Sequence, residues 1–98
     1  MAQFQTNRMV TVSNREGLHA RAATELAKLV RGFQAEVVIL KNQDRVDCGD
    51  VLQILSLGAA MNDELILEAS GQEAEEAIEA AARLFADGFD ENAQIENN

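Results

Sequence analysis

The sequence predicts an α+β fold in which helices cover one face of a mainly antiparallel sheet. Apolar residues recur every three to four positions from Ala20 to Phe33 and from Ala74 to Phe85, which is the period of an amphipathic helix. Other short segments alternate aliphatic with polar residues, as half-buried strands do. In chain order the segments read β-α-β-β-α-β-α. A two-layer, open-faced β-sandwich with four strands and three helices on one face buries all of their apolar sides.

The strands are expected within residues 4–13, 36–41, 45–48 and 64–69. The first helix runs from Ala20 to about Arg31 and stops at Gly32. A short second helix begins at Asp50, where Asp50 and Gln53 have the spacing of a capping box, and continues to about Leu55. The third helix follows a second capping-box pattern at residues 70–73.

The length of 98 residues suits one domain with a single core. We expect that domain to span residues 1–98, with its core over about 8–89 and a polar end that frays from Asp90 to Asn98. The chain has no recognisable signal peptide and no apolar run of transmembrane length. The sequence therefore predicts a cytoplasmic monomer that does not insert into a membrane.

The charge is strongly acidic and unevenly spread. The formal net charge is −9, which argues against nucleic acid as a partner. Residues 1–31 nevertheless carry a net +3 and residues 63–98 a net −10. A local basic surface on an acidic protein indicates an acidic partner or an anionic group.

Metal binding and thiol chemistry are not indicated. The chain has one histidine and one cysteine, which cannot form a zinc site of ordinary spacing. Cys48 lies in an alternating segment and is expected to be a packed, inert thiol. Glu75, Glu76 and Glu79 are interpreted as the solvated side of the third helix, not as metal ligands.

The segment Gly17-Leu18-His19-Ala20-Arg21 holds the only histidine at the predicted start of the first helix. The first N–H groups of a helix have no internal partner, and the helix dipole adds partial positive charge there. An imidazole at this point, with a guanidinium two residues on, could carry or receive a phosphoryl group. The local pattern also fits a histidine that only caps the helix or lies on the surface. No second acid, base or nucleophile in a recognisable motif accompanies His19, which disfavours a small enzyme.

These residues resemble the histidine-containing phosphocarrier (HPr) family of the bacterial phosphoenolpyruvate-dependent sugar phosphotransferase system. The family carries a G-[IL]-H-[AT]-R-P-A segment at the same place in the same order of elements. A second segment, Asp50 to Gly58, resembles the family's regulatory-serine helix, which ends in S/T-L-G. The spacing between the two segments matches without insertion, and the resemblance covers about residues 8 to 89.

The resemblance implies a phosphoryl carrier that is not itself an enzyme and needs no cofactor. His19 would accept phosphate at its pros nitrogen from enzyme I and pass it to a IIA-type domain for sugar transport. The phosphate would be held by Gly17, Ala20, Arg21 and Ala22, with the helix N–H groups and the outward-facing Arg21 stabilising it. Gly17 has two possible roles: it allows the backbone to approach closely, or it is simply a turn glycine.

Two departures from the family bear on function. Ala22 stands where the family has proline, so this chain has an additional N–H in the first helical turn. Asp50 stands where many members have a regulatory serine, and it either mimics the phosphorylated serine or only caps the helix. An alternative function is a regulatory HPr-like module that controls enzymes or transcription factors. The sequence does not separate a sugar branch from a nitrogen or regulatory branch, nor does it name the IIA partner.

The docking surface is expected on the first two helices. It would combine the basic Lys28 and Arg31 with Asp50 and the apolar side of the second helix. That side comprises Val51, Leu52 and Leu55. An apolar patch rimmed by positive charge would suit acidic partners, and the alternative is that Leu52 and Leu55 are buried core.

Overall fold

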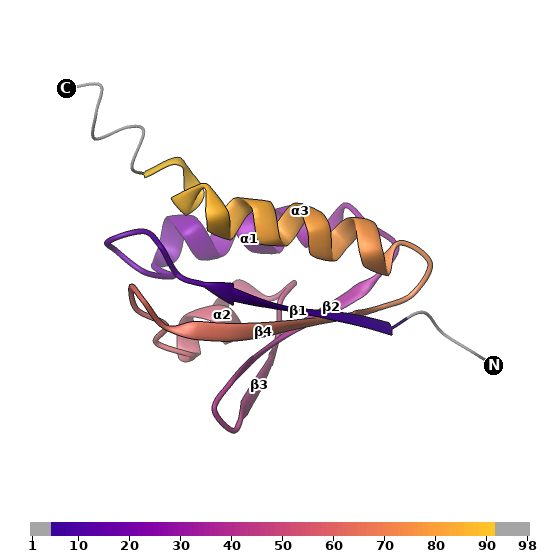
Figure 1. Ribbon diagram of the computed structural model, residues 1–98, viewed down its shortest axis with the longest axis horizontal. Helices are drawn as coiled ribbons and strands as arrows, with labels where there is room; N and C mark the ends of the chain where they lie inside the picture. Colours follow the sequence, from indigo (N-terminus) through magenta and orange to yellow (C-terminus); the bar gives the residue numbers. More distant parts are fainter. Residues whose placement is uncertain (1–4, 92–98) are drawn as a thin grey trace.

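The computed structural model describes residues 5–91 and confirms the two-layer α+β architecture (Figure 1). The strands are β1 (Gln5–Thr11), β2 (Glu36–Lys41), β3 (Asp44–Asp47) and β4 (Glu64–Ser70). The helices are α1 (Ala20–Arg31), α2 (Val51–Ser56) and α3 (Ala74–Ala86), followed by the short 3-10 turn η1 (Gly88–Asp90). The element order is thus the predicted one, with the hairpin strand β3 starting one residue earlier than expected.

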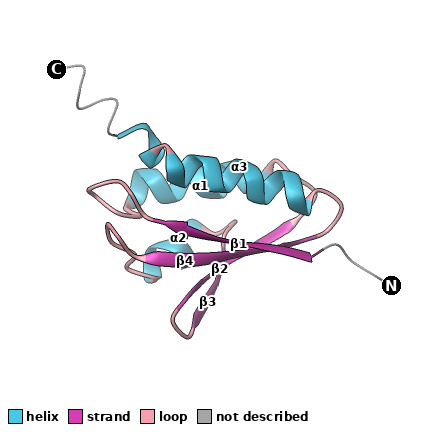
Figure 2. Ribbon diagram, viewed as in Figure 1, coloured by secondary structure: helices cyan, strands magenta, loops and turns pink. Residues whose placement is uncertain are grey.

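The four strands form one sheet in the order β1-β4-β2-β3, and every neighbouring pair is antiparallel. α1 and α3 lie side by side over one face of this sheet, as Figure 2 shows, and α2 packs against α1 and β3. The opposite face is open. There Met9, Ile66 and Leu40 are paired across β1, β4 and β2, and Met9 and Ile66 are exposed.

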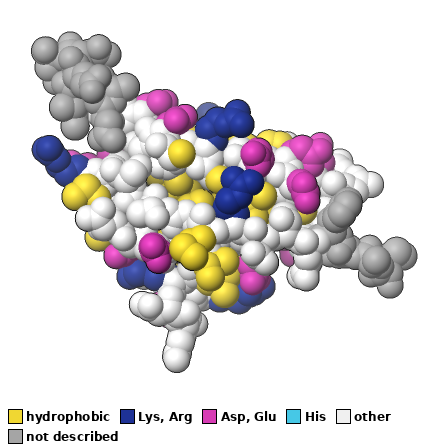
Figure 3. Space-filling view, in the orientation of Figure 1, with side chains coloured by type: hydrophobic (Ala, Val, Ile, Leu, Met, Phe, Trp, Pro, Cys, Tyr) yellow, Lys and Arg dark blue, Asp and Glu magenta, His cyan; other side chains and the backbone are white. Residues whose placement is uncertain are grey.

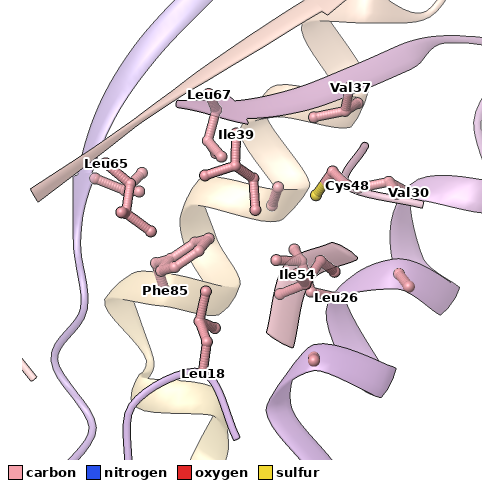
Figure 4. Packing of buried hydrophobic residues seen from close by; sticks show 14 of the residues in the cluster. Leu18, Leu26, Val30, Val37, Ile39, Cys48, Ile54, Leu65, Leu67 and Phe85 are labelled. Carbon is pink, nitrogen blue, oxygen red and sulfur yellow. The ribbon is translucent and has the colours of Figure 1, made fainter. Parts of the chain in front are cut away.

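The core is aliphatic with two phenylalanines, as the composition predicts. Leu26 of α1, Ile54 of α2 and Phe85 of α3 meet Ile39, Leu65 and Leu67 of the sheet (Figure 4). The ring of Phe85 packs edge-to-face against Phe89, with 5.2 Å between centroids. The three helices and Phe89 of η1 therefore share one core.

Cys48 is buried in this core, as expected of a packed thiol. Burial, and secondarily the neighbouring charge of Asp47, raises the pKa of the thiol to about 12. The thiol is therefore protonated at neutral pH and is a poor nucleophile.

Both capping-box predictions need correction. Asp50 does cap α2 by accepting a hydrogen bond from the N–H of Gln53, and the Gln53 side-chain amide donates back to the Asp50 carboxylate at 3.3 Å. The Gln53 side-chain oxygen, however, accepts from the N–H of Asp47 and not from that of Asp50. The prediction for residues 70–73 is wrong, because Ser70 is the last residue of β4 and the N-cap of α3 is Glu73. Glu73 is held there by Gln34, whose backbone N–H donates to its carboxylate at 2.7 Å.

The expectation that the chain frays from Asp90 is wrong for Glu91, which is buried. Its carboxylate contacts side chains from the loop before α1 and from α1 itself. The remainder of the predicted frayed end, residues 92–98, lies outside the described residues.

Candidate functional site

His19 is the N-cap residue of α1, at the junction predicted from the sequence. Its backbone is extended (φ −82°, ψ −173°), and its carbonyl accepts the first helical hydrogen bond, from Ala23. Its side chain makes no capping hydrogen bond and is 32% exposed. The imidazole is therefore free to point away from the helix, and the interpretation as a side-chain cap is wrong.

The loop before His19 is fixed by backbone contacts. The N–H of Gly17 donates to the carbonyl of Asn14, and the N–H of Leu18 donates to the carbonyl of Ala59. Gly17 has a φ of +72°, and a Cβ atom at this position would lie 2.5 Å from the Ala59 oxygen. Gly17 thus both forms a turn and allows a close backbone contact, but that contact is with the backbone of Ala59. Gly17 contributes backbone shape, since its N–H is already engaged.

Three N–H groups of the first turn, those of Ala20, Arg21 and Ala22, find no acceptor among residues 5–91. This is the arrangement that makes a helix start attractive to an anion. Ala20 is exposed and Arg21 half-exposed, whereas Ala22 is 0% exposed. The accessible part of this turn is therefore the part formed by Ala20 and Arg21, while Ala22 is covered by the rest of the protein.

Glu91 lies across the site, and sequence reasoning missed it. The residue is 8% exposed, and its carboxylate contacts the Nε2 atom of His19. Its other contacts are the Asn14 amide, which donates at 3.0 Å, and a guanidinium nitrogen of Arg21 at 3.0 Å. Burial alone would raise the pKa of this carboxyl, but the hydrogen bonds from Asn14 and His19 and the charges of His19 and Arg21 outweigh it. The pKa of Glu91 is therefore below its usual range.

Arg21 is more engaged than the outward-facing side chain expected from the sequence. Besides Glu91 it pairs with Glu25 one turn on, at 2.7 Å, and donates to the carbonyl of Phe89 at 3.1 Å. Phe89 is fully buried, so this hydrogen bond fastens the end of the described chain to α1. Arg21 thus both offers positive charge at the helix start and holds Glu91 in place.

We expect the stability of the protein to report the Glu91 contacts through pH. A carboxyl whose pKa is lowered by folding stabilises the fold above its unfolded pKa of about 4.3. That contribution disappears as the pH falls through the lower, folded pKa. Glu91→Gln should therefore be less stable than the wild type at pH 7, and the two melting temperatures should converge below about pH 4. An offset that stays constant from pH 7 to 3 would contradict the assignment.

Residues 6–87 match the family model described as "PTS HPr component phosphorylation site". The chain belongs to the HPr family. It is a phosphocarrier and not an enzyme, as the resemblance implied.

Several curated relatives are named phosphocarrier protein NPr. The one from Shewanella violacea is 40% identical over 84 residues, covering 86% of this chain and 92% of that protein. The one from Escherichia coli K12 is 37% identical over 84 residues, covering 85% and 93%. Among solved structures, HPr from Thermoanaerobacter tengcongensis has a TM-score of 0.85 at 29% identity and covers 88% of this chain and 97% of that one.

In this HPr-family chain the predicted docking residues Lys28 and Arg31 have different neighbours. Lys28 is exposed and lines a shallow hollow between α1 and α3 with Glu25, Leu29 and Leu84. Arg31 is also exposed but lies beside Gly49, at the start of α2. On the face drawn in Figure 3, basic and acidic side chains alternate, with apolar atoms between them.

The apolar side of α2 is divided. Leu52 is 77% exposed, so the alternative that it belongs to the core is wrong for this residue. Val51 and Leu55 are half-buried against the core, and Ile54 faces fully inward.

None of the helices within residues 5–91 is long and apolar enough to cross a bilayer.

Proposed function

We propose that His19 accepts phosphate from enzyme I, itself charged by phosphoenolpyruvate, and passes it to a IIA-type domain of the sugar phosphotransferase system. The observation that carries this proposal is the place of His19 at the start of α1, beside Arg21 and the free N–H groups of Ala20 and Arg21. A curated relative, the subunit DhaM of Escherichia coli, is described as a phosphoryl donor and is 38% identical over 86 residues. This match covers 88% of the present chain and only 18% of that larger protein.

The chemistry needs little beyond this arrangement. Phosphoryl transfer depends mostly on positioning and on neutralising charge over the phosphoryl oxygens. The helix N–H groups and the Arg21 guanidinium supply donors for those oxygens. The 32% exposure of the imidazole leaves room for a donor or acceptor protein to approach. A carrier of this kind receives and delivers its phosphate without turnover of its own.

The test is to mix the full chain with purified enzyme I and labelled phosphoenolpyruvate, then to add IIA domains. The acceptors are one IIA domain from a sugar branch and one from a nitrogen branch. We expect acid-labile label on the chain and its onward transfer to the sugar IIA domain. Label that moves only to the nitrogen IIA domain would replace the sugar assignment, and label that never leaves the chain would favour a regulatory module.

Asp50→Ser is expected to speed phosphorylation by enzyme I at low salt. Serine also caps helices well, so α2 should remain folded while one negative charge at its start is removed. For an acidic partner the gain in association rate should be about two- to fivefold, equivalent to about 0.5–1 kcal/mol. It should shrink as salt screens surface charge.

The matched control for this prediction is Asp44→Ser. Asp44 is exposed at the start of β3, so the variant makes the same charge change in the β2–β3 hairpin, outside α2. Equal rates for both variants would show that enzyme I responds only to net charge. An unchanged rate for Asp50→Ser across the salt series would leave Asp50 as a helix cap alone.

A further inference from the structure

The contact between Glu91 and His19 has a chemical consequence, because it involves one particular ring nitrogen. The carboxylate meets Nε2, and Nδ1 makes no hydrogen bond within residues 5–91. A neutral imidazole has one N–H donor and one bare nitrogen. An ionised carboxylate can only accept, so the proton of the neutral ring must lie on Nε2.

Glu91 is ionised and firmly placed when the ring is neutral. Its carboxylate is 10% exposed and is held from two further sides, by the Asn14 amide and the Arg21 guanidinium. Asn14 is 0% exposed and also donates to the Gly17 carbonyl, so it is itself fixed by the loop before α1. The lowered pKa of Glu91 agrees with these contacts.

We propose that Glu91 is a positioning residue for phosphoryl transfer: it holds His19 in the Nε2–H tautomer and thereby presents the Nδ1 lone pair as the nucleophile. This inference rests on the proposed function, since it concerns how the same histidine reacts. The site then comprises the helix start, Arg21 and a carboxylate that lies 72 residues after His19 in the sequence.

The transfer step balances without any proton leaving the site. The Nδ1 lone pair of the neutral ring attacks phosphorus, and the Nδ1–P bond forms as the bond between phosphorus and the donor's leaving atom breaks. The donor's leaving atom keeps that electron pair. The ring retains its Nε2 proton and becomes a positively charged phosphoimidazolium. Glu91 therefore faces a positive charge that develops during the reaction, and it stabilises that charge as carboxylates paired with catalytic histidines do.

If Glu91 obstructed the site, its removal would change the phosphorylation rate in the opposite direction. If Glu91 instead occupied the place of the incoming phosphate, the bound carboxylate would repel the phosphoryl group and slow the reaction. Removing it would then speed phosphorylation. The contact to Nε2, away from the nucleophilic Nδ1, is the observation that favours positioning over obstruction.

The experiment uses three full-length variants and two readouts. Glu91→Ala removes the acceptor, Glu91→Gln keeps a neutral one, and Asp90→Asn is the matched control. Asp90 is the exposed neighbour of Glu91, and its positive φ of 63° suits asparagine equally. The first readout is the ¹⁵N spectrum of the histidine ring, recorded at rising alkaline pH until the ring shifts stop changing. The second is the single-turnover rate of phosphorylation by charged enzyme I.

We expect the wild type and Asp90→Asn to show the pure Nε2–H tautomer and equal rates. Glu91→Ala should show a tautomer mixture and a rate lower by about tenfold or more, with Glu91→Gln between them. A faster rate in either Glu91 variant, or an unchanged tautomer in both, would overturn the inference. The backbone amide spectrum verifies that each variant is folded, and Glu91→Gln keeps the shape of the side chain if Glu91→Ala does not fold.

Failure of the proposed function would look different. A wild-type chain that takes no phosphate would refute the carrier role of His19, while the tautomer spectrum needs no donor and would still report the Glu91 contact. A phosphorylated wild type whose rate and ring tautomer do not depend on Glu91 would refute only the positioning role.

Discussion

Replacing His19 by glutamine is expected to abolish acid-labile phosphorylation of this chain. It is the only histidine in the sequence, and no other side chain has its place at the start of α1. The glutamine amide can still donate a hydrogen bond to Glu91, so the buried carboxylate keeps a partner and the fold should survive. The measurement is the label retained after incubation with enzyme I and labelled phosphoenolpyruvate, compared with the wild type.

A neighbouring variant provides the control for that result. Glu16→Gln changes an exposed residue of the same loop and should be labelled like the wild type. The melting temperature of His19→Gln should stay within a few degrees, because changes at partly exposed positions usually alter stability by less than about 1 kcal/mol. Label that remains on folded His19→Gln, or that survives acid, would place the phosphate on another residue.

The fold was predictable because its signals are local. The period of the apolar residues in α1 and α3, the apolar run of β2 and the alternation in β4 each depend on a short window of sequence. The N-terminal start of α3 was misjudged for a reason that is not local. Its N-cap, Glu73, is positioned by Gln34, which lies 39 residues earlier, so no pattern around residues 70–73 could show it.

The site was predictable only where its parts are adjacent in sequence. His19, Arg21 and the helix start lie within a few residues of one another, and their role follows from the geometry of a helix N-terminus. Glu91 is 72 residues from His19 and belongs to a stretch whose polar composition resembles a solvated tail. One sequence signal indicates that the chain near Glu91 is packed: Gly88 and Phe89 interrupt the polar residues that precede Glu91, and both are buried.

Asn14 illustrates a second limit. An asparagine before a glycine-containing loop is typical of a turn. In the structure it is fully buried and joins the Gly17 carbonyl to the Glu91 carboxylate through its amide nitrogen. A buried polar side chain of this kind is recognisable only when its partners are known.

The loop that presents His19 should be unusually intolerant of a single methyl group. Gly17→Ala places a Cβ atom 2.5 Å from the Ala59 oxygen, which is a backbone atom and cannot rotate away. It also forces alanine into the left-handed region, at a φ of +72°. Because the N–H of Leu18 donates to that same Ala59 oxygen, relief of the clash would break this hydrogen bond and shift His19.

Gly58→Ala separates the clash from the backbone conformation. Gly58 has a φ of +61°, close to that of Gly17, but nothing lies within 4 Å of its missing Cβ. We expect Gly58→Ala to cost about 1 kcal/mol in the free energy of unfolding, and Gly17→Ala at least about 2 kcal/mol more. For a domain of this size the additional loss corresponds to a melting temperature lower by about 10 °C. Phosphorylation by enzyme I should slow only in Gly17→Ala, and equal losses in the two variants would show that the loop does not depend on close packing against Ala59.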